Sequence, residues 1–299
     1  MRPALFAKLT WLEAKLFLRE PLAVGFTIAY PLVVMFVIAG VFNRPGEEIR
    51  GVGGAAYYVV SNIAVVIAAM GLIALPPHAA SYFERGVIRR LRASSVPATA
   101  VILAQAAVCF GVAIAATVVL LGAARPASPY PVPQSVPGVV LGFVVGLISF
   151  LALGLLIAAL FPTTRSAQSV GLVLFFPLYL ISGAAPPLSV LPSAMRLVAD
   201  FDPLNYAVRA LQDPWFGYGV TVSNLVVLAA IGVVSGVEPC SSSGAADAAS
   251  ALSVLLRDFA EPVGNPGSRT SVAAALRFPG DEPINRWRRI GAVGRRGTG

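Results

Sequence analysis

Long apolar runs, separated by short polar segments, make up most of the first 236 residues of the chain. A helix needs about 20 apolar residues to cross the hydrocarbon core of a bilayer. The pattern therefore predicts an all-α integral membrane protein with six transmembrane helices, at residues 22–42, 57–77, 98–122, 138–161, 166–183 and 216–236.

Residues 182–215 depart from this pattern, because prolines and aspartates interrupt their apolar residues. The stretches 191–199 and 205–211 are each too short to cross a membrane. We therefore expect short broken helices at the membrane surface between spans five and six, with their non-helical backbone covered by protein or water.

The N-terminal segment has an amphipathic pattern. Lys8, Lys15 and Arg19 follow one helical stripe with leucines beside it, which predicts a helix lying along the inner membrane surface. A secretory signal peptide is the competing interpretation. The run 22–42 that follows has the length of a full span and no small-residue cleavage site closes it, so we expect this run to stay attached as the first span.

Residues 81–97 place four arginines between two uncharged apolar runs. On a helix, Arg85, Arg89 and Arg92 would share one face. An adjoining apolar face would be formed by Val87, Ile88 and Leu91. One interpretation is a topological signal, since basic loops next to spans stay in the cytoplasm. The sharper one is a coupling helix, between spans two and three, that docks on a partner protein.

Composition and charge agree with a membrane protein. Of the 299 residues, 57% are hydrophobic and only 12% are charged. A net charge of +8 would suggest nucleic acid in a soluble chain, but these charges lie in loops and tails, where anionic lipid explains them. We expect no nucleic-acid binding. The two cysteines, Cys109 and Cys240, provide neither a disulfide framework nor a metal cluster.

The distribution of basic residues predicts the orientation in the membrane. Segments assigned to the inside hold nine Lys and Arg before the tail, whereas the outside loops hold five, balanced by five acids. Cytoplasmic loops carry the excess of positive charge, so we expect a multi-pass protein with both ends in the cytoplasm.

Glycines recur along the fourth predicted span. They are Gly138, Gly142, Gly146 and Gly154. Their spacing in multiples of four places them on one face, which lets another helix approach closely. The sequence leaves open whether that helix belongs to the same chain, which we favour, or to a second copy.

Two groups of residues resemble the signatures of ABC-2 type transporter permeases, the membrane subunits of bacterial exporters such as drug-efflux systems. The first is Glu84-Arg85-Gly86-Val87-Ile88-Arg89-Arg90-Leu91, followed by Ser95-Val96-Pro97. The second comprises Ser182, Gly183, Pro186, Pro192, Asp202, Pro203, Leu204, Asn205, Tyr206, Ala207, Ala210 and Leu211. Val87 stands where threonine is common in the family and Asp202 where asparagine is usual. The similarity covers roughly residues 5–236.

The resemblance implies a dimeric channel in the bacterial cytoplasmic membrane, opened by two ATPase subunits. The dimer would be a homodimer or a heterodimer with a related permease. The coupling helix to the ATPase would comprise Glu84, Arg85, Gly86, Val87, Ile88, Arg89, Arg90, Leu91 and Arg92. A P-loop needs a lysine, and the only ones, Lys8 and Lys15, follow no glycine-rich loop. ATP and Mg are therefore expected on the partner, with no cofactor and no enzymatic activity on this chain.

The apolar spans favour a hydrophobic or amphipathic cargo, drug-like or lipid-like. A polysaccharide or glycolipid exporter of the same family is the alternative. From another class, a channel or secondary transporter is disfavoured, because the predicted spans contain no Asp, Glu, Lys, Arg or His, and ion-coupled carriers usually place an ionisable residue there.

Residues 237–299 form a basic tail that departs from the resemblance. It holds eight arginines among many small residues, and a composition of this kind predicts a largely disordered segment near anionic lipid. A shifted reading frame is an equally open hypothesis, because apolar character is lost abruptly where span six should finish. In that case span six would be incomplete.

Overall fold

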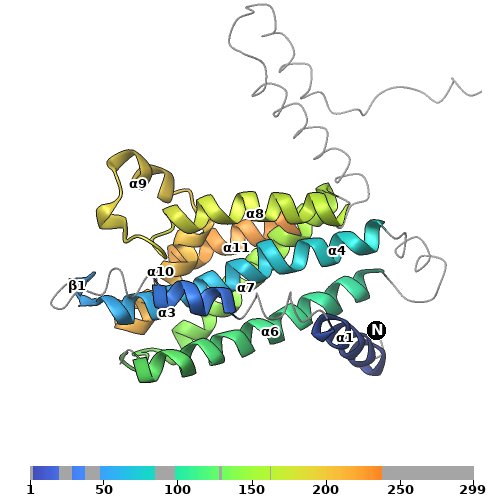
Figure 1. Ribbon diagram of the computed structural model, residues 1–299, viewed down its shortest axis with the longest axis horizontal. Helices are drawn as coiled ribbons and strands as arrows, with labels where there is room; N and C mark the ends of the chain where they lie inside the picture. The colour runs from blue at the N-terminus through green and yellow to red at the C-terminus, as the bar shows by residue number, and fades with distance from the viewer. Residues whose placement is uncertain are drawn as a thin grey trace, which may run out of the picture. The chain divides into compact units, whose positions relative to one another are not determined.

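The structure is a computed structural model and describes residues 3–19, 29–37, 48–84, 98–127, 130–161 and 163–237. The long helices are α1 (Pro3–Leu18), α3 (Gly54–Ala68), α4 (Leu75–Glu84), α6 (Ala98–Ala127), α7 (Val136–Leu160), α8 (Thr164–Ile181), α10 (Pro203–Phe216) and α11 (Val222–Val237). The short ones are the π-helix η1 (Ala69–Ala74), the 3-10 helix η2 (Leu188–Val190) and α9 (Ser193–Ala199). Residues 29–37 are helical too. The helical fold class is confirmed, apart from one small hairpin of β1 (Glu48–Ile49) and β2 (Val52–Gly53) (Figure 1).

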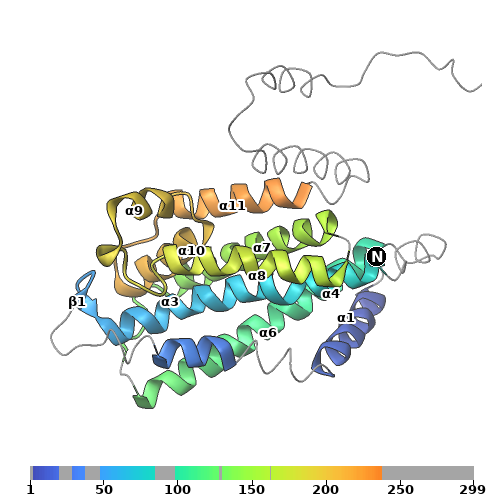
Figure 2. The ribbon, with the colours of Figure 1, turned by 45° about the horizontal axis from the view of Figure 1, so that its top comes forward.

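One long helix forms the centre of the described part of the chain. α3, η1 and α4 continue into one another without a break over residues 54–84, a length of about 45 Å at 1.5 Å per residue. In its most apolar 18-residue stretch, 94% of the residues are buried, because α6, α7, α8 and α10 pack around this helix. In Figure 2 this central helix runs between α8 and α6.

Glycines bring the backbones of the central helix and its neighbours into contact. A Cβ on Gly154 of α7 would lie 2.0 Å from the carbonyl oxygen of Gly71. A Cβ on Gly171 of α8 would lie 1.9 Å from the carbonyl oxygen of Leu72. Both carbonyls belong to the π-helical turn η1, so the middle of the central helix packs backbone against backbone with α7 and α8.

The predicted glycine face of α7 lies against helices of the same chain. A Cβ on Gly138 would meet Pro214, and one on Gly142 would meet the carbonyl oxygen of Ala210 at 2.5 Å, both in α10. Gly146 lies near Ile67 and Ala207. The close approach expected from the glycine spacing is therefore made within the chain, to α10, α3 and η1.

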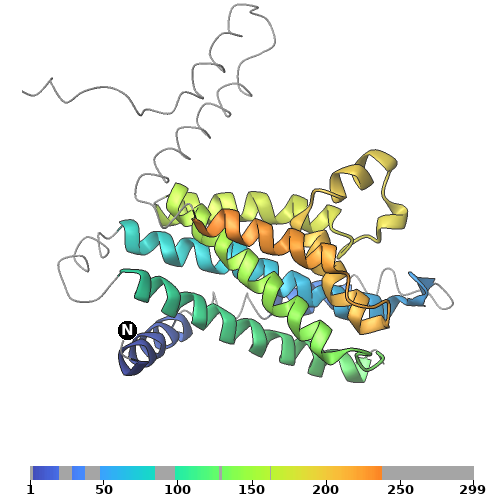
Figure 3. The same ribbon diagram turned by 180° about the vertical axis from the view of Figure 1, so that it is seen from behind.

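α11 packs along α7 (Figure 3). The Ser149 hydroxyl in α7 donates a hydrogen bond of 2.7 Å to the carbonyl oxygen of Leu228, and a Cβ on Gly232 would lie 3.0 Å from the Ser149 oxygen. The last predicted span began at residue 216, but in the structure Phe216 ends α10 and α11 begins at Val222. The break comes from Gly217, whose φ of +86° ends α10, as glycine commonly does after the last helical residue.

Four described helices are long and apolar enough to cross a membrane. They are Gly54–Tyr82, Val101–Pro126, Val136–Leu160 and Thr164–Ile181, in the places of predicted spans two to five. α11 is a shorter apolar helix. Of the first predicted span, only residues 29–37 belong to the described part. A multi-pass membrane protein follows from these four helices.

Residues 182–221 form an irregular segment that contains η2, α9 and α10. The predicted stretch 205–211 lies inside the longer helix α10. This helix begins at Pro203, because Asp202 caps its start and proline is favoured in a first turn. The described residues all lie within one compact unit, Met1–Ala251. The expectations for the tail after Val237 lie outside the described residues.

Candidate functional site

The described chain reaches the predicted coupling segment only at Glu84. Arg85, Gly86, Val87, Ile88, Arg89, Arg90, Leu91 and Arg92 lie outside the described residues. Glu84 lies in α4 and is the last residue described before that segment. Its carboxylate accepts hydrogen bonds from the backbone N–H (2.9 Å) and the hydroxyl (2.7 Å) of Thr164, in the first turn of α8. The chain thus enters this segment from a point tied to α8, where a carboxylate is favoured by the helix dipole.

The Ser-Gly pair after α8 forms a turn. The Ser182 hydroxyl donates to the carbonyl oxygen of Tyr179 and accepts from the N–H of Ala184. Gly183 has a φ of +80°, which favours glycine. Its carbonyl oxygen accepts a hydrogen bond of 2.8 Å from the Tyr57 hydroxyl in α3. These residues therefore end α8 and attach the irregular segment to the central helix.

The Asp-Pro-Leu-Asn-Tyr motif begins α10. The Asp202 carboxylate accepts from the N–H of Leu204 at 2.8 Å, and the Asn205 side chain donates to the carbonyl oxygen of Ala199 at 2.7 Å. The Tyr206 hydroxyl donates to the carbonyl oxygen of Asp200. Asparagine accepts at an N-cap as well as aspartate does, so Asp202 fits the place where the family usually has asparagine.

The other motif residues have apolar side chains and lie nearby. Leu211 is fully buried in α10, Pro203 is in its first turn, Pro192 precedes α9 and Pro186 lies in the turn region after α8. The motif therefore shapes the broken helices. Two of its residues, Ser182 and Asn205, line a cavity of about 400 Å³.

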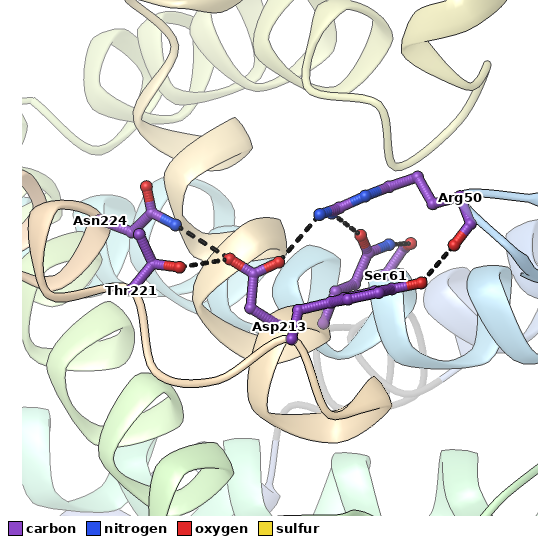
Figure 4. A network of polar contacts seen from close by, with 7 residues as sticks. Arg50, Ser61, Asp213, Thr221 and Asn224 are labelled. Atoms are coloured by element: carbon purple, nitrogen blue, oxygen red, sulfur yellow. Dashed lines mark hydrogen bonds and ion pairs between the residues drawn. The ribbon is translucent and has the colours of Figure 1, made fainter.

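A polar network borders the same cavity (Figure 4). The Arg50 guanidinium, in the β1–β2 turn, donates to Asp213 at 3.0 Å and to Gln212 at 2.9 Å. Gln212 donates to the Ser61 hydroxyl in α3 at 2.7 Å. The network thus joins the hairpin to α10 and to the start of the central helix.

Every oxygen of the buried Asp213 carboxylate has a partner. One oxygen forms the ion pair with Arg50, and the other accepts from Thr221 at 2.9 Å and from Asn224 at 3.3 Å. The Asp213 side chain is 7% exposed and that of Arg50 42%. A buried charge is tolerated when it is paired and hydrogen-bonded in this way, so the network is a structural clamp that also ties α10 to α11.

The hairpin holds Arg50 in a conformation that few residues adopt. Arg50 and Gly51 have φ values of +55° and +72°, as in a two-residue turn between Ile49 and Val52. The Tyr218 hydroxyl donates to the carbonyl oxygen of Arg50, and the guanidinium lies 5.4 Å from the centre of the Tyr218 ring. These contacts keep the guanidinium aimed at Asp213.

From the sequence, Arg50 and Asp213 were counted only among the balanced charges of the outside segments. Their positions differ by 163, so no local pattern links them. The sequence did contain one indication of the ion pair. Asp213 stands among apolar residues, and a carboxylate that becomes buried needs a cationic partner.

The described helices are those of a multi-pass membrane protein. The model of the ABC-2 type transporter family matches residues 4–216, well over half of the chain. The chain therefore belongs to this family, as the resemblance indicated, although the match ends before α11 instead of at residue 236. No curated protein matches the chain.

Proposed function

We propose that this chain is the membrane-spanning subunit of an ATP-driven exporter. It moves hydrophobic or amphipathic compounds, drug-like or lipid-like, out across the bacterial cytoplasmic membrane. The observation that carries this proposal is the family match over residues 4–216, supported by four apolar membrane-length helices. The sequence has no P-loop lysine, so the ATPase, with its ATP and Mg, is a separate polypeptide.

In this proposal the chain has six spans and both ends in the cytoplasm. The helical residues 29–37 belong to the first span and α11 to the last. Two copies, or one copy and a related permease, form the channel, and each binds one ATPase. The exposed apolar side chains of α6 and α8, such as Val118 (63%) and Val173 (70%), are available to lipid or to a second membrane subunit.

The ATPase docks on residues 81–97. The bond between Glu84 and Thr164 supports this placement, because a push on the segment would reach α4 and α8 together. The arginines would meet acidic or polar groups of the ATPase, and Val87, Ile88 and Leu91 would give the apolar contact.

The test is co-purification of the chain with the ATPase encoded beside it. We expect the ATPase to accompany the wild-type chain and to be lost from the double variant Arg89→Glu/Arg90→Glu. The matched control is Arg288→Glu/Arg289→Glu in the tail, which makes the same change of charge and should retain the ATPase. Equal binding by both double variants would contradict docking on residues 81–97, and no binding to any form would reopen the channel or secondary transporter class.

The cargo is tested in cells with and without the permease and its ATPase. The proposal expects lower accumulation of lipophilic compounds when both are present, and no effect of the permease alone. Unchanged accumulation of every compound, together with loss of surface polysaccharide on deletion, would assign the chain to polysaccharide or glycolipid export instead.

A further inference from the structure

α1 turns the Glu13 carboxylate inward and several of its apolar side chains outward. Glu13 and Phe17, one helical turn apart, are 8% and 5% exposed. Trp11 is 74% exposed, and Leu12 and Leu18 are more than half exposed. A helix facing water would do the reverse, so the outer face of α1 suits lipid, and Glu13 needs a reason to point into the protein.

Glu13 lines a cavity of about 370 Å³, which we call the Glu13 cavity. It lies among α1, α4 and α6, and its polar or charged lining residues are Glu13, Arg19, His78, Ser81, Tyr82 and Gln105. Phe17, Val108 and Cys109 add apolar surface. Its size is in the range of small-molecule sites.

The Glu13 carboxylate has a hydrogen bond but no cationic partner within the described ranges. The Tyr82 hydroxyl donates to one of its oxygens at 2.5 Å. Desolvation by burial raises the pKa of Glu13, and the Tyr82 hydrogen bond offsets this only in part. Arg19, directly after α1, lines the same cavity but forms no ion pair with Glu13 in the part of the chain that the structure describes.

Gln105 supplies a second acceptor to the cavity. Its side chain is 5% exposed, and its amide oxygen is buried without a hydrogen-bond partner. Leaving a buried acceptor unpaired is unfavourable, because it has lost its hydrogen bonds to water. The cavity therefore presents a carboxylate and an amide oxygen that a bound group with positive charge and N–H donors would satisfy together.

We propose that the Glu13 cavity binds the protonated amine of an amphipathic molecule that enters from the membrane surface. The ammonium pairs with the Glu13 carboxylate and donates to the Gln105 amide oxygen, while the apolar body lies along Leu16 and Phe17 of α1. Because it names a class of cargo, this inference rests on the proposed export function. Arg19 can meet a phosphate, so the amine could come from an aminophospholipid as well as from an exported compound.

The test is binding to the full chain, purified into nanodiscs of phosphatidylglycerol without the ATPase. The probe is a long-chain primary alkylamine with a fluorescent group at its far end, and the comparison is its neutral N-acetyl derivative. In the wild type we expect the amine to bind about tenfold more tightly than the amide, and in Glu13→Gln the ratio should fall below about twofold. Glu48→Gln, at an exposed position of the hairpin, is the matched control and should retain the wild-type ratio.

Equal binding of amine and amide by the wild type, or an unchanged ratio in Glu13→Gln, overturns the proposal. If Glu13→Gln does not fold, the variant Gln105→Leu provides the test instead. Its affinity for the amine should fall about threefold while its affinity for the amide stays unchanged. An unchanged affinity for the amine overturns the proposal.

The source of the amine is resolved by competition and by cells. Displacement of the probe by phosphatidylethanolamine, but not by added phosphatidylglycerol, identifies an aminophospholipid as the ligand. Lower accumulation of the probe in cells that express permease and ATPase identifies it as cargo. Binding in nanodiscs without any effect on accumulation supports the site and removes amines from the proposed cargo, so the two proposals fail separately.

Discussion

A buried carboxylate from a neighbouring helix lies near each end of the central helix, and the two differ in how fully they are hydrogen-bonded. Near its start, Asp213 accepts hydrogen bonds from Arg50, Thr221 and Asn224. Near its end, Glu13 accepts one from Tyr82 and has no ion pair within the described residues. A fully satisfied network rigidifies a structure, whereas a partly satisfied one leaves free energy for a ligand to recover.

This difference separates a structural clamp from a binding site. The Asp213 network connects four elements of the fold, the hairpin, α3, α10 and α11. The Glu13 cavity connects α1 to α4 by one hydrogen bond and leaves the Gln105 amide oxygen unpaired. Removing the carboxylate at each end should therefore change the stability of the protein by very different amounts.

The largest effect is expected from Asp213→Ala. It leaves the Arg50 guanidinium, Thr221 and Asn224 without their acceptor, and breaking a buried pair costs about 3 kcal/mol. Thermal unfolding in detergent should show it. The control is Asp200→Ala, because Asp200 is 62% exposed and lies 3.8 Å from Arg209, where a surface pair contributes less than about 1 kcal/mol. Equal effects of the two substitutions would show that the hairpin end is no clamp.

Gly154→Ala tests the rigid middle that separates the two ends. Its Cβ would lie 2.0 Å from the Gly71 carbonyl oxygen, so α7 and η1 must move apart, which costs about 1–3 kcal/mol. Gly122→Ala in α6 is the matched control, since no atom lies within 4 Å of its Cβ. That control should gain up to about 1 kcal/mol from helix propensity. A Gly154→Ala variant as stable as the control would contradict the backbone contact.

Asp202, in the same region as the Asp213 network, is not fully paired, because one of its carboxylate oxygens is buried without a partner. Desolvation by burial raises its pKa from 3.8 to about 7, although hydrogen bonds from Leu204 and Asn205 oppose the shift. The folded state then holds a proton that the unfolded state has lost, so stability falls as the pH rises from about 4 to about 7.

Asp202→Asn should remove this loss while preserving the N-cap to Leu204. We expect the variant to gain about 1–2 kcal/mol over the wild type at pH 8 and almost nothing at pH 4. Melting temperatures of both proteins at the two pH values check this. A gain that does not depend on pH would show that Asp202 is not the titrating group.

The smallest effect is expected from Glu13→Gln without ligand. Glutamine still accepts from Tyr82, and the raised pKa of Glu13 means that its charge opposes folding as the pH rises above the usual range of a carboxyl. Stability at pH 8 should be unchanged or slightly higher. A loss as large as that of Asp213→Ala, seen in the same unfolding assay, would make Glu13 a structural residue like Asp213.

Local sequence patterns predicted the helices well. Apolar runs placed helices at predicted spans two to five, because hydropathy and helix length depend only on neighbouring residues. Family membership was readable from two short motifs, now confirmed over residues 4–216. The break at Gly217 was not predicted, since a glycine in an apolar run ends a helix only where its positive φ fits the surrounding structure.

The contacts of Asp213 and Glu13, near the two ends of the central helix, could not be predicted from the sequence. The sequence showed Lys8, Lys15 and Arg19 as a stripe on the N-terminal helix, but not that Glu13 of the same helix would be the buried residue. It showed Arg50 and Asp213 as separate polar residues. Burial of a polar side chain depends on which helices pack around it, and no periodicity along one helix reports that.

The sequence by itself determined that this protein lies in a membrane, where its four membrane-length helices fall and to which family it belongs, because those properties follow from apolar length and local motifs. Only the tertiary structure decided that Asp213 is fully paired and that Glu13 is not. The physical reason is that both outcomes depend on partners far along the chain, such as Arg50 for Asp213 and Tyr82 for Glu13.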